Sequence, residues 1–411
     1  MTTAPSATSL PGEVRRVLVV EAGPIDPASN AGDRACADLL DGLVAIGAEV
    51  RFHGLGSRGS ADERLLAAMR DRHPEIVISH NDGSRNDKDL GAILDADPRD
   101  VVIASRPGTA LLCGPALEAR PELVRIFWGH DIHARRLAAQ QSVRGDVTDR
   151  RSALMTMVEA RAWDAFDLSV YPAASESDAV NNVAPGKGAA APYYRLADAD
   201  LPPDVPARTG RNGILMVGSS FHAPNLDAAE WAVAKILPII RADQPDAMLT
   251  IVGDWSEADM QSLARPGVRF TGLVSDDELR RLHNQHICLL APLRFGGGTK
   301  RKIVAAMGLG LPVVTTDEGQ RGLLVRDGQG ESDGMSLGND PESLAAAVSR
   351  LHMDDERWIT MSAAARNAAS RVYQSPAYDQ ALAQILENGA ALRDARLDPL
   401  SPVVGSSGPP P

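Results

Sequence analysis

Short apolar segments alternate with helix-patterned segments along most of the 411 residues of this chain. The series begins with a strand at 14–23, a helix at 35–47 and a strand at 48–54, and further strands are expected at 75–80, 100–106 and 123–131. A strand that is followed by a helix and then by another strand favours a parallel sheet covered by helices. The alternation starts again at residue 213, so a second sheet of the same kind is predicted.

The length of the chain also favours two domains, because 411 residues exceed an ordinary single domain and 44% of them are hydrophobic. A Pro-rich polar segment at 196–212 interrupts the alternation and is interpreted as a linker. It separates a first domain at 14–195 from a second at 213–375. The expected fold is α/β, with two Rossmann-like domains facing each other across a cleft. Residues 1–13 and 396–411 are rich in Ser, Gly and Pro and are expected to be disordered.

The most informative motif lies at 292–316, where a glycine-rich loop precedes a helix-patterned segment. Glycines let the backbone turn sharply and bring its N–H groups close to a ligand. Thr299 is expected to cap the helix, whose positive end then faces the loop. The alternative is an ordinary Gly-rich turn with solvated lysines. The candidate phosphate-binding residues are Arg294, Gly296, Gly297, Gly298, Thr299 and Lys300.

Polar residues also follow predicted strands in the first half, where ligands of α/β sheets bind. His130 and Asp131 come directly after one strand, and an imidazole can both donate to and accept from hydroxyl groups. The alternative is that both residues cap the next helix. His80 and Asn81, followed by Asp82, end another strand.

Four further residues lie in loops or at predicted helix starts. Gly32 either lets backbone N–H groups approach a diphosphate or is an ordinary loop glycine. Asp33 and Asn225 are expected to cap helices, and His133 is expected to lie on a helix surface.

Six segments follow one another along the chain in a recognisable order. They are RIFWGHDIHARRL (125–137), WDAFDLSVYPAASESDAV (163–180), GILMVGSSFHAPNLDAAEW (213–231), AMLTIVGDW (247–255), VRFTGLVSDDELRRL (268–282) and the glycine-rich run at 292–316. The series resembles the retaining glycosyltransferases of family four, over about residues 15–385. The resemblance implies the two-domain GT-B fold and a C-terminal helix at 376–395 that crosses back to the first domain.

The resemblance further implies transfer of a sugar from a nucleotide-diphosphate sugar to an acceptor hydroxyl, with retention and without a metal or cofactor. His130 and Asp131 would be catalytic, and the first domain would bind the acceptor through His80 and Asn81. Gly32 and the residues named in the glycine-rich motif would hold the donor diphosphate. The residues implied in nucleotide binding are Gly218, Ser219, His222, Thr271 and Gly272. The nucleotide, the sugar and the acceptor are left open: the acceptor is a glycan, a lipid-linked molecule or a small molecule.

The chain departs from the family at several positions, and a basic pair that commonly follows the first strand of the second domain is also missing. Gly297 and Ala305 stand where many members carry glutamates, and Arg321 stands where a Glu is often found. The second glutamate usually binds the nucleotide ribose, so Ala305 removes an acceptor for its hydroxyls. A catalytically silent partner or activator with the same fold is therefore the alternative function, and a sugar-nucleotide epimerase is a minor one. Arg321 is expected to pair with Glu318 or Asp317.

Composition argues against several classes of protein. The net charge of −12 disfavours a nucleic-acid binder, which needs a clustered basic surface. No apolar run is long enough to span a bilayer and the N-terminus lacks a signal-peptide pattern, so a cytoplasmic protein is expected. Cys36, Cys113 and Cys288 lie far apart in apolar contexts, which predicts buried thiols with no disulfide and no structural zinc.

Overall fold

The computed structural model describes residues 15–57, 59–81, 83, 89–145, 149–202, 207–324 and 333–398. Within these ranges the chain forms two compact units, each built on one parallel sheet. The described residues up to 134, 149–195 and those from 376 onward make the first unit. Residues 135–145 and the described part of 196–375 make the second. The regions predicted to be disordered, 1–13 and most of 396–411, lie outside the described residues.

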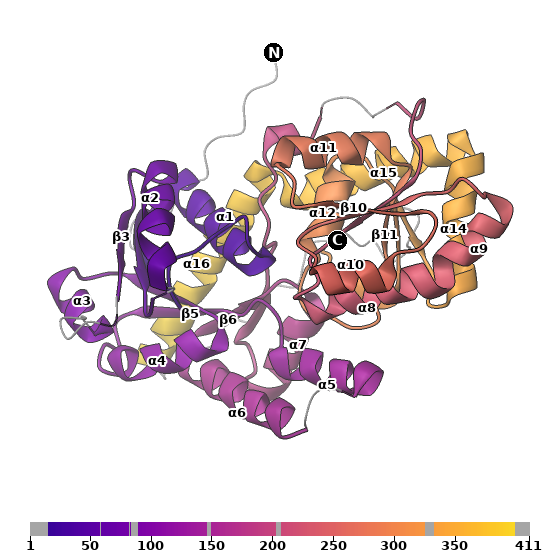
Figure 1. The fold of residues 1–411 in the computed structure, drawn as a ribbon. Coiled ribbons are helices and arrows are strands. Elements are labelled where there is room, and N and C mark those ends of the chain that lie inside the picture. The colour runs from indigo at the N-terminus through magenta and orange to yellow at the C-terminus, as the bar shows by residue number, and fades with distance from the viewer. Residues whose placement is uncertain are drawn as a thin grey trace, which may run out of the picture. The chain divides into compact units, whose positions relative to one another are not determined.

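The first unit is a sheet with helices packed around it (Figure 1). Its described strands are β1 (Arg16–Glu21), β2 (Glu49–Gly54), β3 (Val77–His80), β4 (Val101–Ser105), β5 (Val124–Trp128), β6 (Leu168–Tyr171) and β7 (Gly188–Ala190), in the order β3-β2-β1-β4-β5-β6-β7. Val17 of β1 lies opposite both Val50 and Val101, so β1 is paired on both sides. Four successive apolar residues of β1 are fully buried, as expected for a strand covered by helices on both faces.

Helices of the first unit follow the strands they connect. They are α1 (Ala31–Ala45), α2 (Asp62–Arg72), α3 (Leu90–Ala96), α4 (Pro107–Glu118), α6 (Asp149–Ala165), α7 (Ala174–Val183) and the C-terminal α16 (Ser375–Leu397). A short 3₁₀ turn, Gly59–Ala61, precedes α2. Asn30, not Asp33, caps α1, because its side chain accepts from the backbone N–H of Asp33. The prediction of Asp33 as the cap was therefore wrong.

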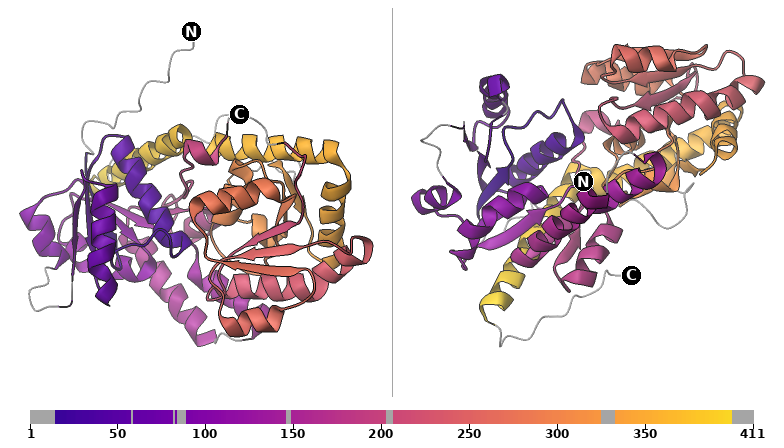
Figure 2. Two further views of the ribbon diagram at one scale, coloured as in Figure 1. Left: turned by 45° about the horizontal axis from the view of Figure 1, so that its top comes forward. Right: turned by 60° about the horizontal axis from the view of Figure 1, so that its bottom comes forward.

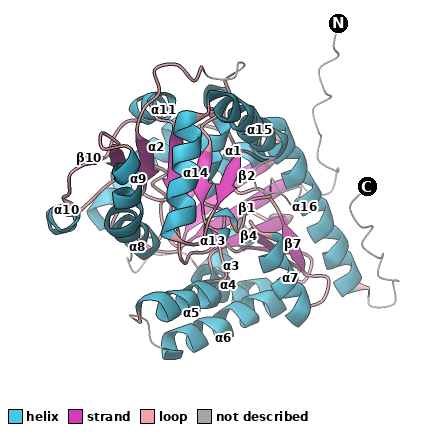
Figure 3. Ribbon diagram, turned by 90° about the vertical axis from the view of Figure 1, so that its right-hand side faces the viewer, coloured by secondary structure: helices cyan, strands magenta, loops and turns pink. Residues whose placement is uncertain are grey.

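The second unit repeats the same design. Its described strands are β8 (Ile214–Val217), β9 (Leu249–Val252), β10 (Val268–Gly272), β11 (Cys288–Ala291), β12 (Val313–Thr315) and β13 (Met335–Leu337), in the order β10-β9-β8-β11-β12-β13. Its helices are α8 (Ala223–Trp231), α9 (Leu237–Asp243), α10 (Glu257–Leu263), α11 (Asp276–Gln285), α12 (Arg301–Gly308), α13 (Asp317–Gln320), α14 (Pro341–Met353) and α15 (Asp355–Tyr373). A single π-helical segment, Ala232–Ile236, joins α8 to α9, and α9 lies beside α14 (Figure 3). Trp358 of α15 is fully buried in the core of this unit.

Two segments lie differently from their sequence-based assignment. Most of α5 (His133–Arg144) groups with the second unit from residue 135 on, although 14–195 was predicted as one domain. An ion pair of Arg144 with Glu230 anchors it there. The described part of the predicted linker, which includes a 3₁₀ turn at Asp198–Asp200, also belongs to the second unit. Arg211 is buried, lies 4.8 Å from the centre of the Trp358 ring and donates to the carbonyl of His283, so this segment packs on the unit.

The C-terminal helix α16 belongs to the first unit, which it reaches after α15 ends in the second (yellow in Figure 2). Gly389 of α16 lies against Val124 and Ile126 of β5, where an added Cβ would come within 2.9 Å of the Val124 side chain. Near its end, Arg396 donates to Asp167 at 2.6 Å. The helix runs to Leu397, which is two residues beyond the predicted end at 395.

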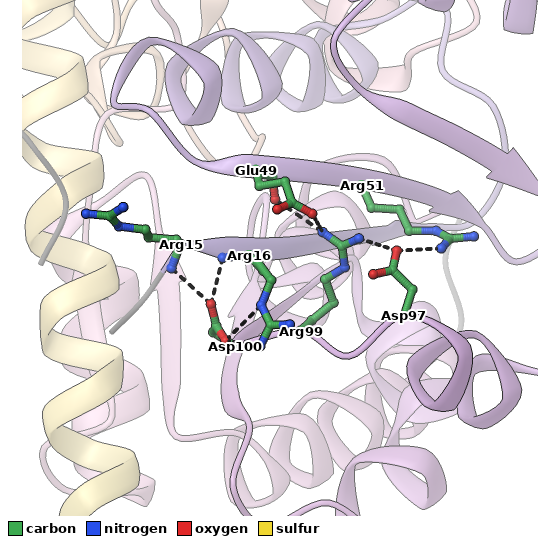
Figure 4. A network of polar contacts seen from close by, with 7 residues as sticks. All are labelled: Arg15, Arg16, Glu49, Arg51, Asp97, Arg99 and Asp100. Carbon is green, nitrogen blue, oxygen red and sulfur yellow. Dashed lines mark hydrogen bonds and ion pairs between the residues drawn. The ribbon is translucent and has the colours of Figure 1, made fainter. Parts of the chain in front are cut away.

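A network of ion pairs covers the amino-terminal edge of the first sheet (Figure 4). Asp100 accepts from the backbone N–H groups of Arg15 and Arg16 and from the Arg16 guanidinium. Arg99, with a side chain only 3% exposed, pairs with Asp97 and Glu49. This edge lies opposite the carboxyl ends of the strands, so the network is remote from the edge where ligands of α/β sheets bind.

The described residues contain no helix that is both long and apolar enough to cross a membrane. All three cysteines are buried free thiols, as the sequence predicted, and burial raises the pKa of Cys113 and Cys288 to about 12.

Candidate functional site

Each sheet has a point where the chain reverses its direction of winding. In the second unit the strands progress outward from β8 in one direction and from β11 in the other, so β8 and β11 lie side by side at this point. The first sheet has the same arrangement at β1 and β4. Ligands of open α/β sheets bind in the crevice beyond the carboxyl ends of such neighbouring strands. The regions beyond the carboxyl ends of these strand pairs, here called the two crevices, are therefore the candidate binding regions, one in each unit.

The turn after β8 is tightly packed around Gly218. Its φ is +152°, and an added Cβ would lie 2.5 Å from the side-chain carbon of Asn225. The carbonyl of Gly218 accepts from the indole N–H of Trp255 at 2.7 Å. Asn225 is buried inside α8 and donates to the carbonyl of Ser219, so it closes the turn and does not cap the helix as predicted.

The glycine-rich loop follows β11 at the other side of the same crevice. Gly298 takes a φ of +58°, and the Thr299 hydroxyl donates to the carbonyl of Gly322. Lys300, not Thr299, stands at the N-cap of α12, and it makes no side-chain cap bond. The predicted cap was wrong because the Thr299 hydroxyl is used to join this loop to the turn at Gly322.

The Lys300 ammonium group is directed into the protein. Its side chain is 6% exposed and donates at 3.0 Å to the carbonyls of Gly298 and Arg321, with Glu318 at 3.7 Å. Gly296 lies against the same side chain. Lys300 therefore holds the loop in shape through backbone carbonyls. Arg321 pairs with Glu318 at 3.3 Å, which confirms the ion pair expected from the sequence.

Lys302 connects the two sides of the crevice. Its ammonium group donates to the side-chain oxygen of Asn225 at 2.5 Å, so it joins the start of α12 to the turn after β8. Burial, and to a smaller extent the charge of Lys300, lowers the pKa of Lys302 to about 7. A negatively charged ligand near this amine would favour its protonated form. Lys302 is thus a group of this region whose charge would respond to a bound anion.

Arg294 is held by a buried acid. Its guanidinium makes a two-point contact with Asp227, which is 1% exposed, at 2.9 and 2.5 Å. It also lies 5.6 Å from the centre of the Trp231 ring. The predicted contribution of Arg294 to phosphate binding would therefore compete with Asp227. The site assignment for Arg294 is accordingly weaker than that for Lys302.

The other residues predicted to bind the nucleotide lie on the same edge of the second sheet. Ser219 accepts from the backbone N–H of Asp254 at 3.0 Å, and His222 stands exposed at the N-cap position of α8. Thr271 donates to the carbonyl of Gly272 at 3.0 Å, and Gly272 has a φ of +73° with open space for 4 Å around the position that a Cβ would take. Open space at Gly272 is compatible with a flat ligand lying against the backbone.

His130 lies beyond β5 in the crevice region of the first unit. Its Nε2 is 2.8 Å from the hydroxyl of Ser105, the last residue of β4. The edge of its ring faces Tyr193, with ring centres 5.8 Å apart. Burial, with a smaller contribution from the charge of Arg106, lowers the pKa of His130 to about 3. The imidazole is therefore neutral at physiological pH.

Asp131 and His133 have roles at the start of α5. The Asp131 carboxylate lies 2.9 Å from Nδ1 of His133, which does not lie freely on the helix surface as predicted. Fully buried Glu159 accepts from the backbone N–H groups of His133 and Ala134. Asp131 is engaged with this helix start, which supports the alternative interpretation for Asp131 but not for His130.

The remaining candidate residues of the first unit contact other parts of the protein. An added Cβ at Gly32 would come within 3.0 Å of the Arg106 guanidinium, so this glycine leaves space for an arginine. His80 lies 3.6 Å from Asp62. Asn81 donates its backbone N–H to Gly54 at 2.8 Å. Asp82 lies outside the described residues.

Residues that the sequence interpretation did not select complete both crevices. Lys302 was quoted only as part of a motif and Asn225 was expected only to cap a helix, and their contact spans 77 positions. Glu21 and Ser105 end β1 and β4, and strand ends at a reversal point are a signal that could have selected them. Among the described residues no group of three or more His, Cys, Asp or Glu side chains is arranged to hold a metal ion.

A family model and one known protein match parts of this chain by sequence. Residues 211–354 match the family model described as Glycosyl transferases group 1, and the match lies within the second unit. The chain is 28% identical over 123 residues to an uncharacterized 44.6 kDa protein in the cps region of Klebsiella pneumoniae, a match that covers 28% of this chain and 32% of that protein.

The fold is similar to that of solved structures along nearly the whole chain. Sucrose-phosphate synthase from Thermosynechococcus elongatus has a TM-score of 0.66 at 16% identity, covering 91% of this chain and 98% of that one. Anabaena HepE in complex with UDP and glucose has a TM-score of 0.61 at 14% identity, covering 91% and 99%. A glycosyltransferase from Rickettsia africae has a TM-score of 0.62 at 15% identity, covering 92% and 98%.

These likenesses define the class of protein by its fold. The chain has the GT-B fold of two Rossmann-like domains, as the sequence predicted. Its second domain carries the match to group 1 glycosyl transferases, and both crevices described above lie in domains of this fold.

Proposed function

We propose that this protein is a glycosyltransferase that moves a sugar from a nucleotide-diphosphate sugar to an acceptor hydroxyl. The observation that carries the proposal is the contact between Lys302 and Asn225, which joins two turns at the reversal point of the second sheet. This crevice lies within the segment that matches group 1 glycosyl transferases. The complex of HepE with UDP and glucose supports a nucleotide-sugar donor.

The chemistry required of this site is stabilisation of the departing nucleoside diphosphate. Lys302 at the start of α12 supplies a cation, and the helix start and the backbone of the Gly296–Gly298 loop supply N–H groups. Together the protonated amine and the backbone dipoles would replace a divalent metal ion, so we propose a reaction that needs neither metal nor cofactor. We also propose, from the resemblance to family four, that the configuration of the transferred sugar is retained.

His130 of the first unit is the proposed catalytic residue for the sugar. A neutral imidazole both donates and accepts one hydrogen bond, which suits contact with hydroxyl groups. Asp131 is retained in the proposal as its neighbour at the start of α5. His80 and Asn81 are proposed to face the acceptor, whose chemical class is left open. We further propose a cytoplasmic location, and we propose no nucleic-acid partner because the net charge is −12.

One alternative is favoured by a specific observation. Ala305 and Gly297 provide no carboxylate where related enzymes often carry glutamates. A protein of this fold that binds a nucleotide sugar weakly or not at all would act as a partner or activator of another enzyme.

The test is incubation of the purified protein with UDP-, GDP-, dTDP- and ADP-sugars without added metal, followed by measurement of the nucleoside diphosphate released. We expect one donor class to be turned over, and we expect the His130→Ala variant to lose that activity while still binding the nucleoside diphosphate. Absence of turnover and of binding across the panel, with a folded protein, would support the partner alternative.

A further inference from the structure

Four polar residues in the first unit form a connected chain that ends on His130. Glu21, at the end of β1, is fully buried and lies beside Ser105 and Arg106, at the end of β4. Arg106 also pairs with fully buried Asp33 of α1 at 2.8 Å. All of these groups gather at the reversal point of the first sheet, where β1 and β4 are neighbours.

Arg106 is held there in an unusual backbone conformation. Its φ is +74°, and it is the one residue other than glycine with a positive φ among the described parts of the chain. Such a conformation is unfavourable for a residue other than glycine and persists only where surrounding contacts determine it. In this position the Arg106 Nε donates to Oε1 of Glu21 at 2.8 Å. The strained backbone thus accompanies a fixed contact with one oxygen of the carboxylate.

The two oxygens of Glu21 have different partners. Oε1 accepts from Arg106 and from the backbone N–H of Ala22, both at 2.8 Å, while Oε2 accepts from the Ser105 hydroxyl at 2.7 Å. Burial raises the pKa of Glu21, and the adjacent Arg106 cation offsets only part of that rise. The geometry assigns the carboxylate form, because Oε1 accepts from two donors and one of them is the guanidinium cation. A carboxylate is an acceptor only, so the Ser105 hydroxyl proton must point at Oε2.

The direction of the hydrogen bond between Ser105 and Glu21 determines which ring nitrogen of His130 carries the proton. Ser105 has one hydroxyl proton, which it uses in the hydrogen bond that it donates to Glu21. The Ser105 oxygen can then only accept a hydrogen bond from Nε2 of His130, which lies 2.8 Å away. We infer that Glu21 and Ser105 are positioning residues that fix His130 as the Nε2–H tautomer. The acceptor nitrogen of this imidazole is then Nδ1. The ring is also oriented by Tyr193, whose own ring stacks on Trp128 at 4.4 Å.

The assigned tautomer follows from the contacts of Glu21, Ser105 and His130 alone. Its consequence for sugar transfer rests on the proposed function. With Nδ1 as the acceptor, His130 would receive a hydrogen bond from a sugar or acceptor hydroxyl rather than donate one to it. Orientation of a histidine through the group bonded to its other nitrogen is a common way to set its tautomer. The tautomer itself can be measured whether or not the protein transfers sugar.

The test is long-range ¹H–¹⁵N correlation spectroscopy of the protein labelled with ¹⁵N-histidine. The His130 signals are identified by their loss in His130→Asn, because the chain has 9 histidines. In the wild type we expect a protonated Nε2 and an unprotonated Nδ1. A protonated Nδ1 in the wild type would overturn the inference, because Ser105 would then be donating to the imidazole.

The Glu21→Gln variant gives the sharpest result. Arg106 and Ala22 both donate toward the Oε1 position, so the amide oxygen should settle there and the amide N–H₂ should face Ser105. Ser105 would then accept from Gln and donate to His130, which reverses the tautomer to Nδ1–H. Persistence of Nε2–H in the folded variant would refute the inference that Glu21 fixes the tautomer of His130 through Ser105.

Variants of Ser105 provide the control and protect the test against misfolding of Glu21→Gln. Ser105→Thr keeps the hydroxyl and should keep the wild-type tautomer, whereas Ser105→Ala should give a mixture of the two. An unchanged single tautomer in Ser105→Ala would show that another group fixes His130. If the tautomers behave as expected but no sugar nucleotide is turned over, the proposed function fails and the positioning role stands.

Discussion

The turn at Gly322 offers a direct test of the glycine-rich loop. Gly322 has a φ of +89°, and an added Cβ would lie 2.4 Å from the carbonyl oxygen of Gly298 and 3.0 Å from the backbone N of Thr299. The atoms that a Gly322→Ala side chain would meet are all backbone atoms of the candidate diphosphate-binding loop. The substitution should therefore both destabilise the second unit and displace this loop.

The matched control is Gly210→Ala. Gly210 has nearly the same φ, +81°, but nothing lies within 4 Å of its Cβ position. Both variants should lose about 1–2 kcal/mol of stability because alanine is forced into the left-handed backbone region. Gly322→Ala should lose about 1–3 kcal/mol more from overpacking. For a domain of about 150–250 residues, 1 kcal/mol corresponds to roughly 2–4 °C in melting temperature.

The assay is thermal unfolding of both variants, with calorimetric titration of the nucleoside diphosphate that the wild type binds. We expect Gly322→Ala to melt at least about 2 °C below Gly210→Ala. We also expect it alone to lose diphosphate affinity. Equal melting temperatures together with unchanged affinity would refute the argument that the Gly322 turn supports the loop.

Three other predictions concern stability and activity. In Asp100→Asn the melting temperature should fall at pH 7. Burial raises the pKa of Asp100, but its bonds with Arg16 and Arg15 together leave the folded pKa below the ordinary 3.8. Its contribution to stability is therefore present above pH 3.8 and is lost as the pH falls through the folded pKa. A deficit that is the same at pH 7 and pH 3 would contradict this. Trp358→Phe removes the donor to the Ile287 carbonyl at 2.6 Å and should cost about 1–3 kcal/mol in urea unfolding, which an unchanged midpoint would exclude. His130→Ala should abolish turnover of the donor without lowering the melting temperature of the second unit, and retained turnover would remove His130 from the mechanism.

The fold was predictable because its signals are local. The continuous apolar runs of β1 and β11 and the helix patterns between strands are read within about ten residues of sequence. The division of the chain was harder, because the segment at 196–212 has the composition of a linker. This segment packs on the second unit through Arg211, whose contact with Trp358 joins residues far apart in the sequence.

The candidate site was only partly predictable, because residue type does not give the direction of a side chain. Lys300 and Lys302 are two positions apart in one motif, yet Lys300 donates to carbonyls of its own loop and Lys302 reaches Asn225 on another turn. Thr299 was expected to cap α12 and instead joins the loop to Gly322. Such assignments depend on contacts between loops that no local pattern encodes.

The most direct test of the central claim is a comparison of diphosphate binding in the wild type and Lys302→Met, with Lys235→Met as the control because Lys235 is exposed on the segment between α8 and α9. Each protein is titrated with the preferred nucleoside diphosphate and with the matching nucleoside. Loss of the contact between a cation and the diphosphate should weaken binding by about tenfold or more, which corresponds to about 1.4 kcal/mol. We expect this loss for the diphosphate alone and only in Lys302→Met. Equal affinities in all three proteins would contradict a diphosphate site at the Lys302–Asn225 crevice.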